Sequence, residues 1–470
     1  MNESILEHTI NQALKHNPSF ASVRGETHKL SHYLLKNGVI EAVSSSVESG
    51  YNVKMLLNGA LSFSSTNIWS KEEAESIVSS ATKQAKNTKR ASKIDFGVEK
   101  GIKDAWKVEE KKALRNTDES EIIKRLEGID KALSDLKLKI PGRIFSFGID
   151  ETEKIIMNSE GSIIKANYTK ISLHSFITIM ENNKSKQFYK MYGHTGGLEA
   201  FDEWHVEDDL KNECLVQKKI IYEGVSLEPG KYTIICGPEV AGITAHESSG
   251  HPMEADRILG RELSQAGGSF VTIDSIGNTI GSEYATVVDD PTIPNSYGYF
   301  KYDDEGTKAQ KKYLYKNGKI NEFLQNRESA SKSSMKTNGS SRAESYDVED
   351  IVRMSNTYIE PGDWSKEELF KEVKKGVYMK SFTEWNIDDK RFNQKYVARE
   401  AYLIVNGEIK QPLNRCVLEI STPNYWKSIT ASSKELEWSA ATCGKGDPEQ
   451  GVPVFTGGPT IRLEGVYLYE

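Results

Sequence analysis

The chain has 470 residues, of which 27% are charged and 37% are apolar, and its net charge is −7. This length exceeds what one hydrophobic core supports and predicts roughly two or three domains. No apolar run approaches the ~18 residues with which a helix crosses a bilayer, which predicts a soluble globular protein. The negative charge provides no broad basic face and argues against nucleic acid as a partner.

The start of the chain lacks the basic region and apolar stretch of a secretory signal, so we expect a cytoplasmic protein with no membrane partner. Its four cysteines form no C-x-x-C pair, which favours neither a disulfide framework nor a four-cysteine zinc knuckle. They are Cys214, Cys236, Cys416 and Cys443.

Residues 1–97 are expected to form an N-terminal α/β domain. Apolar residues at helical spacing predict a helix over 4–15, and Ser70 with Glu73 predicts a capped helix from there to about residue 88. Between these helices the alternation of apolar and polar residues predicts β-structure. The expected strands are 20–27, 28–35 and 39–48, followed by a hairpin over 50–63 that turns at Asn58-Gly59.

Residues 98–223 are expected to form a middle domain that combines a helix with an antiparallel sheet. The polar, lysine-rich segment 89–108 is typical of a domain boundary. Two helices are predicted, over 118–137 and 202–217. Between them, the predicted strands are 143–150, 153–158, 162–168 and 170–181.

Residues 224–470 are expected to form a β-rich C-terminal domain, so the predicted fold class is α+β. Its first strand, 231–236, ends at Gly237-Pro238, and a helix begins at Glu239. Asp303-Asp304-Glu305-Gly306 is predicted to be a solvated acidic turn. Further predicted strands are 272–274, 285–289, 318–323, 396–405, 408–409 and 416–420.

The helix that begins at Glu239 contains the segment with the clearest chemical character, His246-Glu247-Ser248-Ser249-Gly250-His251. Histidines five residues apart diverge by about 140° on an ideal α-helix. For both rings to bind one metal ion, the helix must bulge by one residue or end there. Gly250 and Pro252, which are poor residues for a helix interior, bracket the second histidine and favour such a distortion.

Two histidines in one helix could also be structural, one buried and one exposed. The rigid strand before the helix favours a site instead, as do the two carboxylates after it. Glu254 and Asp256 are placed to accept hydrogen bonds from a ligand histidine or to contact substrate. Two histidines remain one ligand short of a catalytic metal site.

These residues resemble the TldD/PmbA metalloprotease family, also called modulators of DNA gyrase. The match is to the TldD branch, whose H-E-x-x-G-H motif is followed by Glu-x-Asp, here Glu254 and Asp256. PmbA-type members lack the metal motif, so its presence places this chain on the side expected to be catalytic. Further matches cover nearly the whole chain: 50–63, Asn158-Ser159-Glu160-Gly161, 288–292, 303–306, Arg342 with 353–357, and Cys443-Gly444-Lys445-Gly446.

The resemblance implies an α+β protease of about three parts, with one metal ion, expected to be Zn²⁺, held by two histidines and a distant cysteine. It also implies dimers that enclose a cavity where unfolded peptides are cut. The partner would be a second copy or a metal-lacking PmbA-type paralogue. The pair Ser248-Ser249 departs from the small or apolar residues usual after the glutamate, which leaves ligation intact and alters the packing of the helix.

Cys443 is the cysteine that best suits the third ligand. Cys236 and Cys416 lie in apolar strand patterns where a thiol is usually inert, and Cys214 lies in a polar helix. Cys443 lies among glycines that allow close approach to a metal, and Lys445 would help to keep its sulfur as thiolate. The alternative is a mobile glycine loop with an exposed thiol, and the family resemblance favours the ligand role.

These residues are compatible with three functions. The first is a metallopeptidase in which metal-bound water attacks the peptide and Glu247 is the general base. The second is a regulatory or binding protein of the gyrase-modulator type, with a structural metal. The third is a metal amidohydrolase that does not cleave proteins. Two histidines and one cysteine leave an open coordination position, which favours an enzyme.

Overall fold

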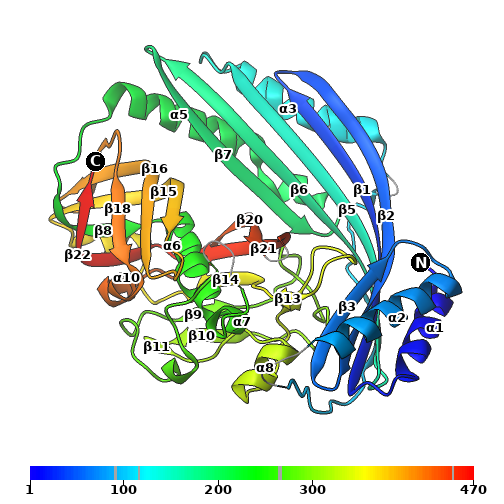
Figure 1. Ribbon diagram of the computed structural model, residues 1–470. Helices are drawn as coiled ribbons and strands as arrows, with labels where there is room; N and C mark the ends of the chain where they lie inside the picture. Colours follow the sequence, from blue (N-terminus) through cyan, green and yellow to red (C-terminus); the bar gives the residue numbers. More distant parts are fainter. Residues whose placement is uncertain (89–92, 115–116, 263–266, 447–448) are drawn as a thin grey trace.

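A computed structural model describes residues 1–88, 93–114, 117–262, 267–446 and 449–470. Within them, one strongly curved sheet arches over a C-terminal region that holds a small β-barrel and a second sheet (Figure 1). The chain is therefore an α+β protein, which confirms the predicted fold class. Within the described ranges, no helix has the length and apolar character needed to cross a bilayer.

The curved sheet, or half-barrel, contains the first seven strands in the order β3-β2-β1-β5-β6, with β4 and β7 both paired to β6. β1 and β5, which lie on either side of the expected boundary at residue 97, are neighbours in this sheet. Its strands are β1 (Phe20–Lys36), β2 (Val39–Leu57), β3 (Ala60–Thr66), β4 (Lys103–Lys107), β5 (Gly142–Asn158), β6 (Ile163–Glu181) and β7 (Lys184–Thr195).

Several predicted strands are pieces of longer ones. Segments 20–27 and 28–35 both belong to β1, 143–150 and 153–158 to β5, and 162–168 and 170–181 to β6. The hairpin at Asn58-Gly59 is confirmed, with left-handed φ angles of 53° and 79° that suit a tight turn. β4 lies inside the segment 89–108 expected to be a boundary, of which 89–92 fall outside the described residues.

Helices cover this sheet in two groups. α1 (Glu3–Leu14) and α2 (Lys71–Asn87) pack on β1, β2 and β3 through an apolar core that includes Leu6, Val53 and Ile77. The predicted cap is present, since Ser70 accepts from the Glu73 amide. The second group is α3 (Glu119–Ser134), α4 (Glu199–Trp204) and α5 (Val206–Glu223). The single helix predicted over 202–217 is instead α4 and α5, separated at His205, whose φ is 48°.

The small β-barrel in the C-terminal region closes through the pairings β15-β8-β22-β18-β16-β15. β17 extends from β16 and β19 pairs with β22. The elements are β8 (Gly230–Cys236), β15 (Lys375–Ile387), β16 (Asn393–Val405), β17 (Glu408–Pro412), β18 (Val417–Ser421), β19 (Ile429–Ser432) and β22 (Ile461–Tyr469), with α9 (Lys366–Lys371) and α10 (Thr422–Ser428) beside them.

The second C-terminal sheet has the order β11-β10-β9-β14-β21-β20. The prediction of a strand over 272–274 is wrong, because Ile273–Ser275 form a 3₁₀ turn capped by Thr272. Of the strand predicted over 318–323, only β11 forms. The elements are β9 (Val287–Asp289), β10 (Lys312–Lys316), β11 (Lys319–Ile320), β14 (Asn356–Ile359), β20 (Glu437–Lys445) and β21 (Gln450–Gly458), with β12 (Ser341–Arg342), β13 (Ile351–Val352) and α8 (Arg327–Ser333) nearby.

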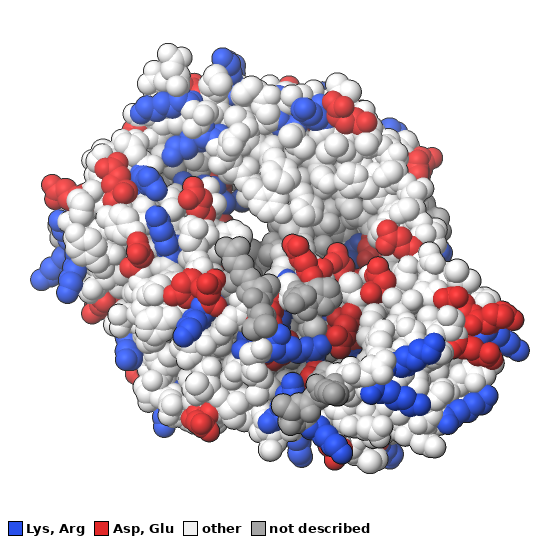
Figure 2. Space-filling view, in the orientation of Figure 1, with Lys and Arg blue, Asp and Glu red and all other residues white. Residues whose placement is uncertain are grey.

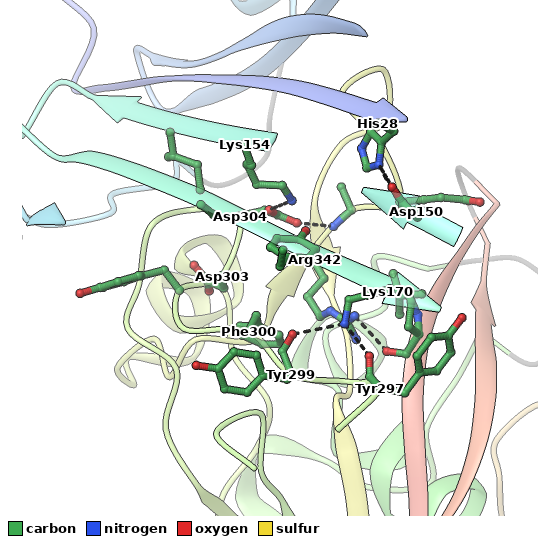
Figure 3. A pocket seen from close by; sticks show the side chains of 18 of the residues that line it. His28, Asp150, Lys154, Lys170, Tyr297, Tyr299, Phe300, Asp303, Asp304 and Arg342 are labelled. Atoms are coloured by element: carbon green, nitrogen blue, oxygen red, sulfur yellow. Dashed lines mark hydrogen bonds and ion pairs between the residues drawn. The ribbon is translucent and has the colours of Figure 1, made fainter. Parts of the chain in front are cut away.

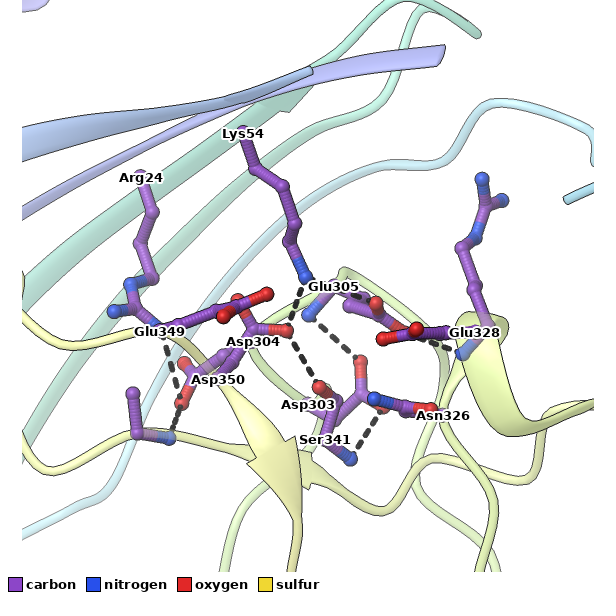
Figure 4. Close-up of polar contacts among 12 residues, drawn as sticks. Arg24, Lys54, Asp303, Asp304, Glu305, Asn326, Glu328, Ser341, Glu349 and Asp350 are labelled. Atoms are coloured by element: carbon purple, nitrogen blue, oxygen red, sulfur yellow. Dashed lines mark hydrogen bonds and ion pairs between the residues drawn. The ribbon is translucent and has the colours of Figure 1, made fainter. Parts of the chain in front are cut away.

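A layer of buried charges joins the half-barrel to the C-terminal region (Figure 4). Lys54 of β2 reaches across to Asp350 at 2.5 Å and to Glu305 at 3.0 Å. Lys154 of β5 lies 2.5 Å from Asp304. The acidic turn at 303–306 is therefore buried and paired, and the prediction that it is solvated is wrong. It was misread because its cationic partners are far away in the sequence.

Candidate metal centre

The strand β8 carries the chain into the candidate site. It ends at Cys236. The next residue is Gly237, where a Cβ would lie 2.3 Å from the backbone oxygen of Lys380, so only glycine fits. Pro238 then occupies the first turn of α6 (Pro238–Ala245), where its missing N–H leaves no hydrogen bond unmade. The helix thus starts at a fixed point on the barrel wall.

The helix changes its winding at the two histidines. α6 continues into a π-helical turn, His246–Gly250, and then into a 3₁₀ turn, His251–Met253. The His251 amide donates to the carbonyl of His246, five residues earlier, so the two rings come onto the same side and their centroids lie 4.9 Å apart. The predicted bulge of one residue is present. A Cβ on Gly250 would lie 1.8 Å from Met354 Sδ, so a larger residue here would force the buried side chain of Met354 to move.

Cys443 reaches the same place from β20. Its sulfur lies 3.4 Å from His251 Nε2, and potential ligand atoms of His246, His251 and Cys443 all lie within 4.8 Å of one another. All three side chains are buried. Cys443 pairs with Val452 in the β20–β21 ladder, so it lies in a strand, and the alternative of an exposed thiol in a mobile loop is wrong.

The electrostatic surroundings favour a thiolate at Cys443. Burial alone would raise its pKa, but the nearby His251, His246 and Arg353 outweigh burial and hold the pKa well below its ordinary value. The other three cysteines differ, because they lie in apolar cores and burial raises their thiol pKa values, to about 12 for Cys214 and Cys416.

Glu254, Asp256 and Lys445 lie beside the cluster. Glu254 is buried, and its carboxylate lies 2.9 Å from His251 Nδ1 and 2.6 Å from Arg257 Nε. Lys445 lies 2.8 Å from Asp256 and 3.4 Å from Glu254. Glu254 thus orients the ring of His251, while Lys445 forms a buried ion pair with Asp256. The positive charges that favour the thiolate come from the histidines and Arg353.

Glu247 is buried next to the cluster, where its carboxylate forms an ion pair with Arg391. Burial would raise the pKa of Glu247, but Arg391 and then the two histidines lower it. Arg391 lies in the turn between β15 and β16 at a φ of 62°, and Thr422 Oγ1 donates to its carbonyl. Sequence reasoning missed Arg391, because it is 144 residues from Glu247 and belongs to no local motif.

The residues fit a zinc ion. Two imidazoles and a thiolate are common zinc ligands, and three protein ligands leave one position for water or substrate. Nδ1 of His246 is buried without a hydrogen-bond partner among the described residues, as expected of a side chain whose partner is a metal ion. A metal so held, with a carboxylate beside it, is suited to hydrolysis.

Comparisons with known proteins show similarity to metallopeptidases. Residues 229–469 match the family model of the PmbA/TldA metallopeptidase C-terminal domain, and residues 21–85 match that of domain 1. A metalloprotease of Methanocaldococcus jannaschii is 33% identical over 94% of this chain and 95% of its own length. A zinc metalloprotease TldD homolog of Saccharolobus solfataricus is 28% identical over 90% of each chain.

Solved structures share the fold. A putative modulator of DNA gyrase from Bacteroides thetaiotaomicron has a TM-score of 0.77 at 18% identity and covers 100% of this chain and 98% of that one. TldE from Thermococcus kodakarensis has a TM-score of 0.77 at 17% identity and covers 99% and 100%. At these low sequence identities, the likeness shows a shared fold and nothing about function.

Proposed function

This chain belongs to the PmbA/TldD metallopeptidase family, and from that premise we propose that it is a zinc-dependent peptidase that cleaves unfolded or extended peptides. The observation that carries the proposal is the meeting of His246, His251 and Cys443 beside the buried carboxylate of Glu247. One Zn²⁺ per chain would be held by these three side chains.

The bound zinc would polarise the scissile carbonyl and lower the pKa of water. Glu247 is the general base: its carboxylate takes a proton from the attacking water and delivers it to the leaving amine. Arg391 keeps that carboxylate ionised and therefore able to accept the proton. Glu254 holds Nδ1 of His251, which leaves Nε2 directed at the cluster.

A structural metal in a regulatory protein is the first alternative. Such a site closes with a fourth protein ligand. Among the described residues, the cluster of histidine, cysteine and carboxylate ligands holds three members, which favours the enzyme. A metal amidohydrolase would use the same parts, and its preference for small amides over peptides would distinguish it.

The decisive experiment is Glu247→Gln, with Glu239→Gln near the start of α6 as a matched control. We expect Glu247→Gln to keep its zinc, measured by elemental analysis, and to lose hydrolysis of an unfolded peptide library by at least ~100-fold. Glu239 forms its ion pair with Arg399 and not with a residue of the cluster. The substitution Glu239→Gln should therefore leave turnover unchanged. Near-native turnover by Glu247→Gln would refute the role of general base.

We also propose a form of the substrate and a partner, and the shape of the molecule supports both. Figure 2 shows a deep hollow beneath the half-barrel, with acidic side chains along part of its rim. We propose that a second copy, or a metal-lacking PmbA-type paralogue, covers this hollow, so that extended chains enter and folded domains do not. Light scattering should then report a dimer or larger, and a reduced, unfolded protein should be cut faster than its native form. An active monomer, or equal cleavage rates, would contradict enclosure.

A further inference from the structure

A cavity of about 250 Å³ lies between the half-barrel and the C-terminal region (Figure 3). Its walls come from β5 and β6, from the segment 297–304, and from the β20–β21 hairpin. Thr442 lines it, whereas the next residue, Cys443, belongs to the metal cluster. Because successive side chains of a strand point to opposite faces, the side chains of Thr442 and Cys443 lie on opposite faces of β20, and His246, His251 and Cys443 are not among the lining residues of the cavity.

Two cationic side chains of the cavity wall, Lys170 and Arg342, have only neutral partners. Lys170 donates to Thr195 Oγ1 at 3.0 Å and to the carbonyls of Tyr297 and Tyr299. Arg342 donates to the carbonyls of Met354 and Pro453, at 2.7 and 2.9 Å. In the described part of the chain, no carboxylate lies within 4.0 Å of the charged nitrogens of either side chain.

The other cations at this cavity are neutralised. Lys154 lies 2.5 Å from Asp304 and 2.9 Å from Glu26, and His28 lies 3.0 Å from Asp150. Lys170 and Arg342 thus differ from Lys154 and His28 in having no carboxylate partner. A buried charge without a counterion is strongly unfavourable, so an anion bound beside Lys170 and Arg342 would be stabilised.

Arg342 also disfavours the charged form of Lys170. Burial and then Arg342 hold the pKa of Lys170 well below its ordinary value. Burial and then Arg353 lower the pKa of Arg342 to about 10, although Asp304 and Asp289, which are too distant to form ion pairs with it, act in the opposite direction. An anion between Lys170 and Arg342 would remove this repulsion, and the planar guanidinium of Arg342 matches the geometry of a carboxylate.

Much of the remaining wall is aromatic, and the carboxyl groups that also line the cavity are those of Asp150, Asp303, Asp304 and Glu344. Trp106 stacks on Tyr168 with ring centroids 5.5 Å apart, Tyr299 meets Trp106 edge-on, and Arg342 lies over the ring of Phe300 at 5.3 Å. Such walls suit a flat or apolar body next to the charged group. The volume limits the ligand to a small molecule or to the last residue of a chain.

We propose that this cavity is a carboxylate-binding site in which Lys170 and Arg342 hold the carboxylate and the aromatic walls hold an apolar body. Two sources share this chemistry, a free aromatic or aliphatic acid and the C-terminal carboxylate of a peptide. The site is distinct from the metal cluster, and its occupancy does not depend on peptidase activity.

Calorimetry on the full-length protein, in buffer without carboxylate or phosphate, tests the proposal. The probes are benzoate against benzamide, Gly-Gly-Phe against its C-terminal amide, and inorganic phosphate. The peptide arms use the Glu247→Gln chain so that no probe is cleaved. We expect at least one acid to bind at least ~10-fold more tightly than its amide, and the arm that binds identifies the source.

The variants Lys170→Met and Arg342→Met locate the binding, with Lys319→Met as a control that removes an exposed cation. Each of the first two should weaken binding at least ~10-fold, and Lys319→Met should leave it unchanged. Thermal unfolding checks each fold, and if neither methionine variant folds, the comparison of acid with amide in the native chain decides. Equal binding of acid and amide, tighter binding of phosphate, or binding that survives both substitutions would overturn the proposal.

Discussion

Cys443 lies in the strand ladder with its sulfur beside the two histidines, so its removal should act on the metal before it acts on the fold. We expect Cys443→Ala to lower zinc content and hydrolysis together. Cys236→Ala is the control, because that thiol is buried among apolar residues of the barrel core and should affect stability alone. Elemental analysis measures the zinc content of each variant, and peptide turnover measures its hydrolysis. A metal-bound structure should show the sulfur about 2.3 Å from zinc, and full occupancy in Cys443→Ala would mean that another residue completes the site.

Arg391 sets the protonation of Glu247, which gives a prediction for the dependence of rate on pH. Arg391 is the largest influence that lowers the pKa of this carboxyl, so Arg391→Met should raise that pKa. Glu247 would then protonate at higher pH, and the acidic limb of the profile of rate against pH would shift upward. Arg391→Lys, which keeps the charge, should restore most of the native profile. An unshifted limb in Arg391→Met would show that the ion pair does not control the base.

The contrast between these two residues shows how far the sequence could predict the site. His246, Glu247 and His251 form a local pattern, and their separation of five residues already required a distorted helix. Cys443 needed the family resemblance to rank above the other cysteines. Arg391 could not be predicted, since its role arises when a turn between two barrel strands folds against the π-helical turn that carries Glu247.

The π-helical turn depends on the missing side chain of Gly250. Gly250→Ala would push a methyl group into Met354 Sδ, which should destabilise the protein by about 1–3 kcal/mol and lower zinc content by moving His251. Gly444→Ala, one residue after Cys443, is the matched control, because a Cβ there meets nothing within 4 Å. Denaturant unfolding and elemental analysis measure the two effects. Equal stabilities would mean that the turn accommodates the methyl group.

The pairing of β1 with β5 carries a titratable contact, His28 with Asp150. Burial lowers the pKa of His28, but hydrogen bonds to Asp150 and Glu26 outweigh burial and raise the pKa to about 10. This stabilisation is fully present below the unfolded pKa of about 6.5 and is lost as pH rises toward 10. The temperature of the unfolding midpoint should therefore decrease as pH rises from about 6.5 to 10. His28→Gln should flatten that slope, and an unchanged slope would exclude His28 as its source.

Elements were predicted well where their signal is local. Helices, tight turns and most half-barrel strands follow from spacing and turn residues, although long strands were divided because polar residues interrupt their alternation. Closure of the barrel was not predictable, because β8 pairs with β15 and β22, which lie far along the chain. Such pairings depend on packing between distant segments, which no short pattern encodes.

At the scale of the whole molecule, the charge layer of Figure 4 should couple the half-barrel to the C-terminal region. Lys54→Met would leave Asp350 and Glu305 buried without their shared cation, which should cost about 3–5 kcal/mol. Lys165→Met, in the same sheet, removes an exposed pair with Glu3 and should cost roughly 0–1 kcal/mol. Denaturant unfolding compares the two variants, and similar losses would mean that the layer adds no stability.

The separation of the metal ligands also has a consequence for the time at which the protein acquires its metal. Cys443 follows His251 by 192 residues, which at ~5–20 residues per second is on the order of ten to forty seconds of synthesis. During that interval a nascent chain carries the two histidines without the thiolate. The full ligand set exists only after β20 has been made and has paired with β21. For the peptidase proposed above, we therefore expect a growing chain on the ribosome to be inactive toward itself and its unfolded neighbours until the fold is complete.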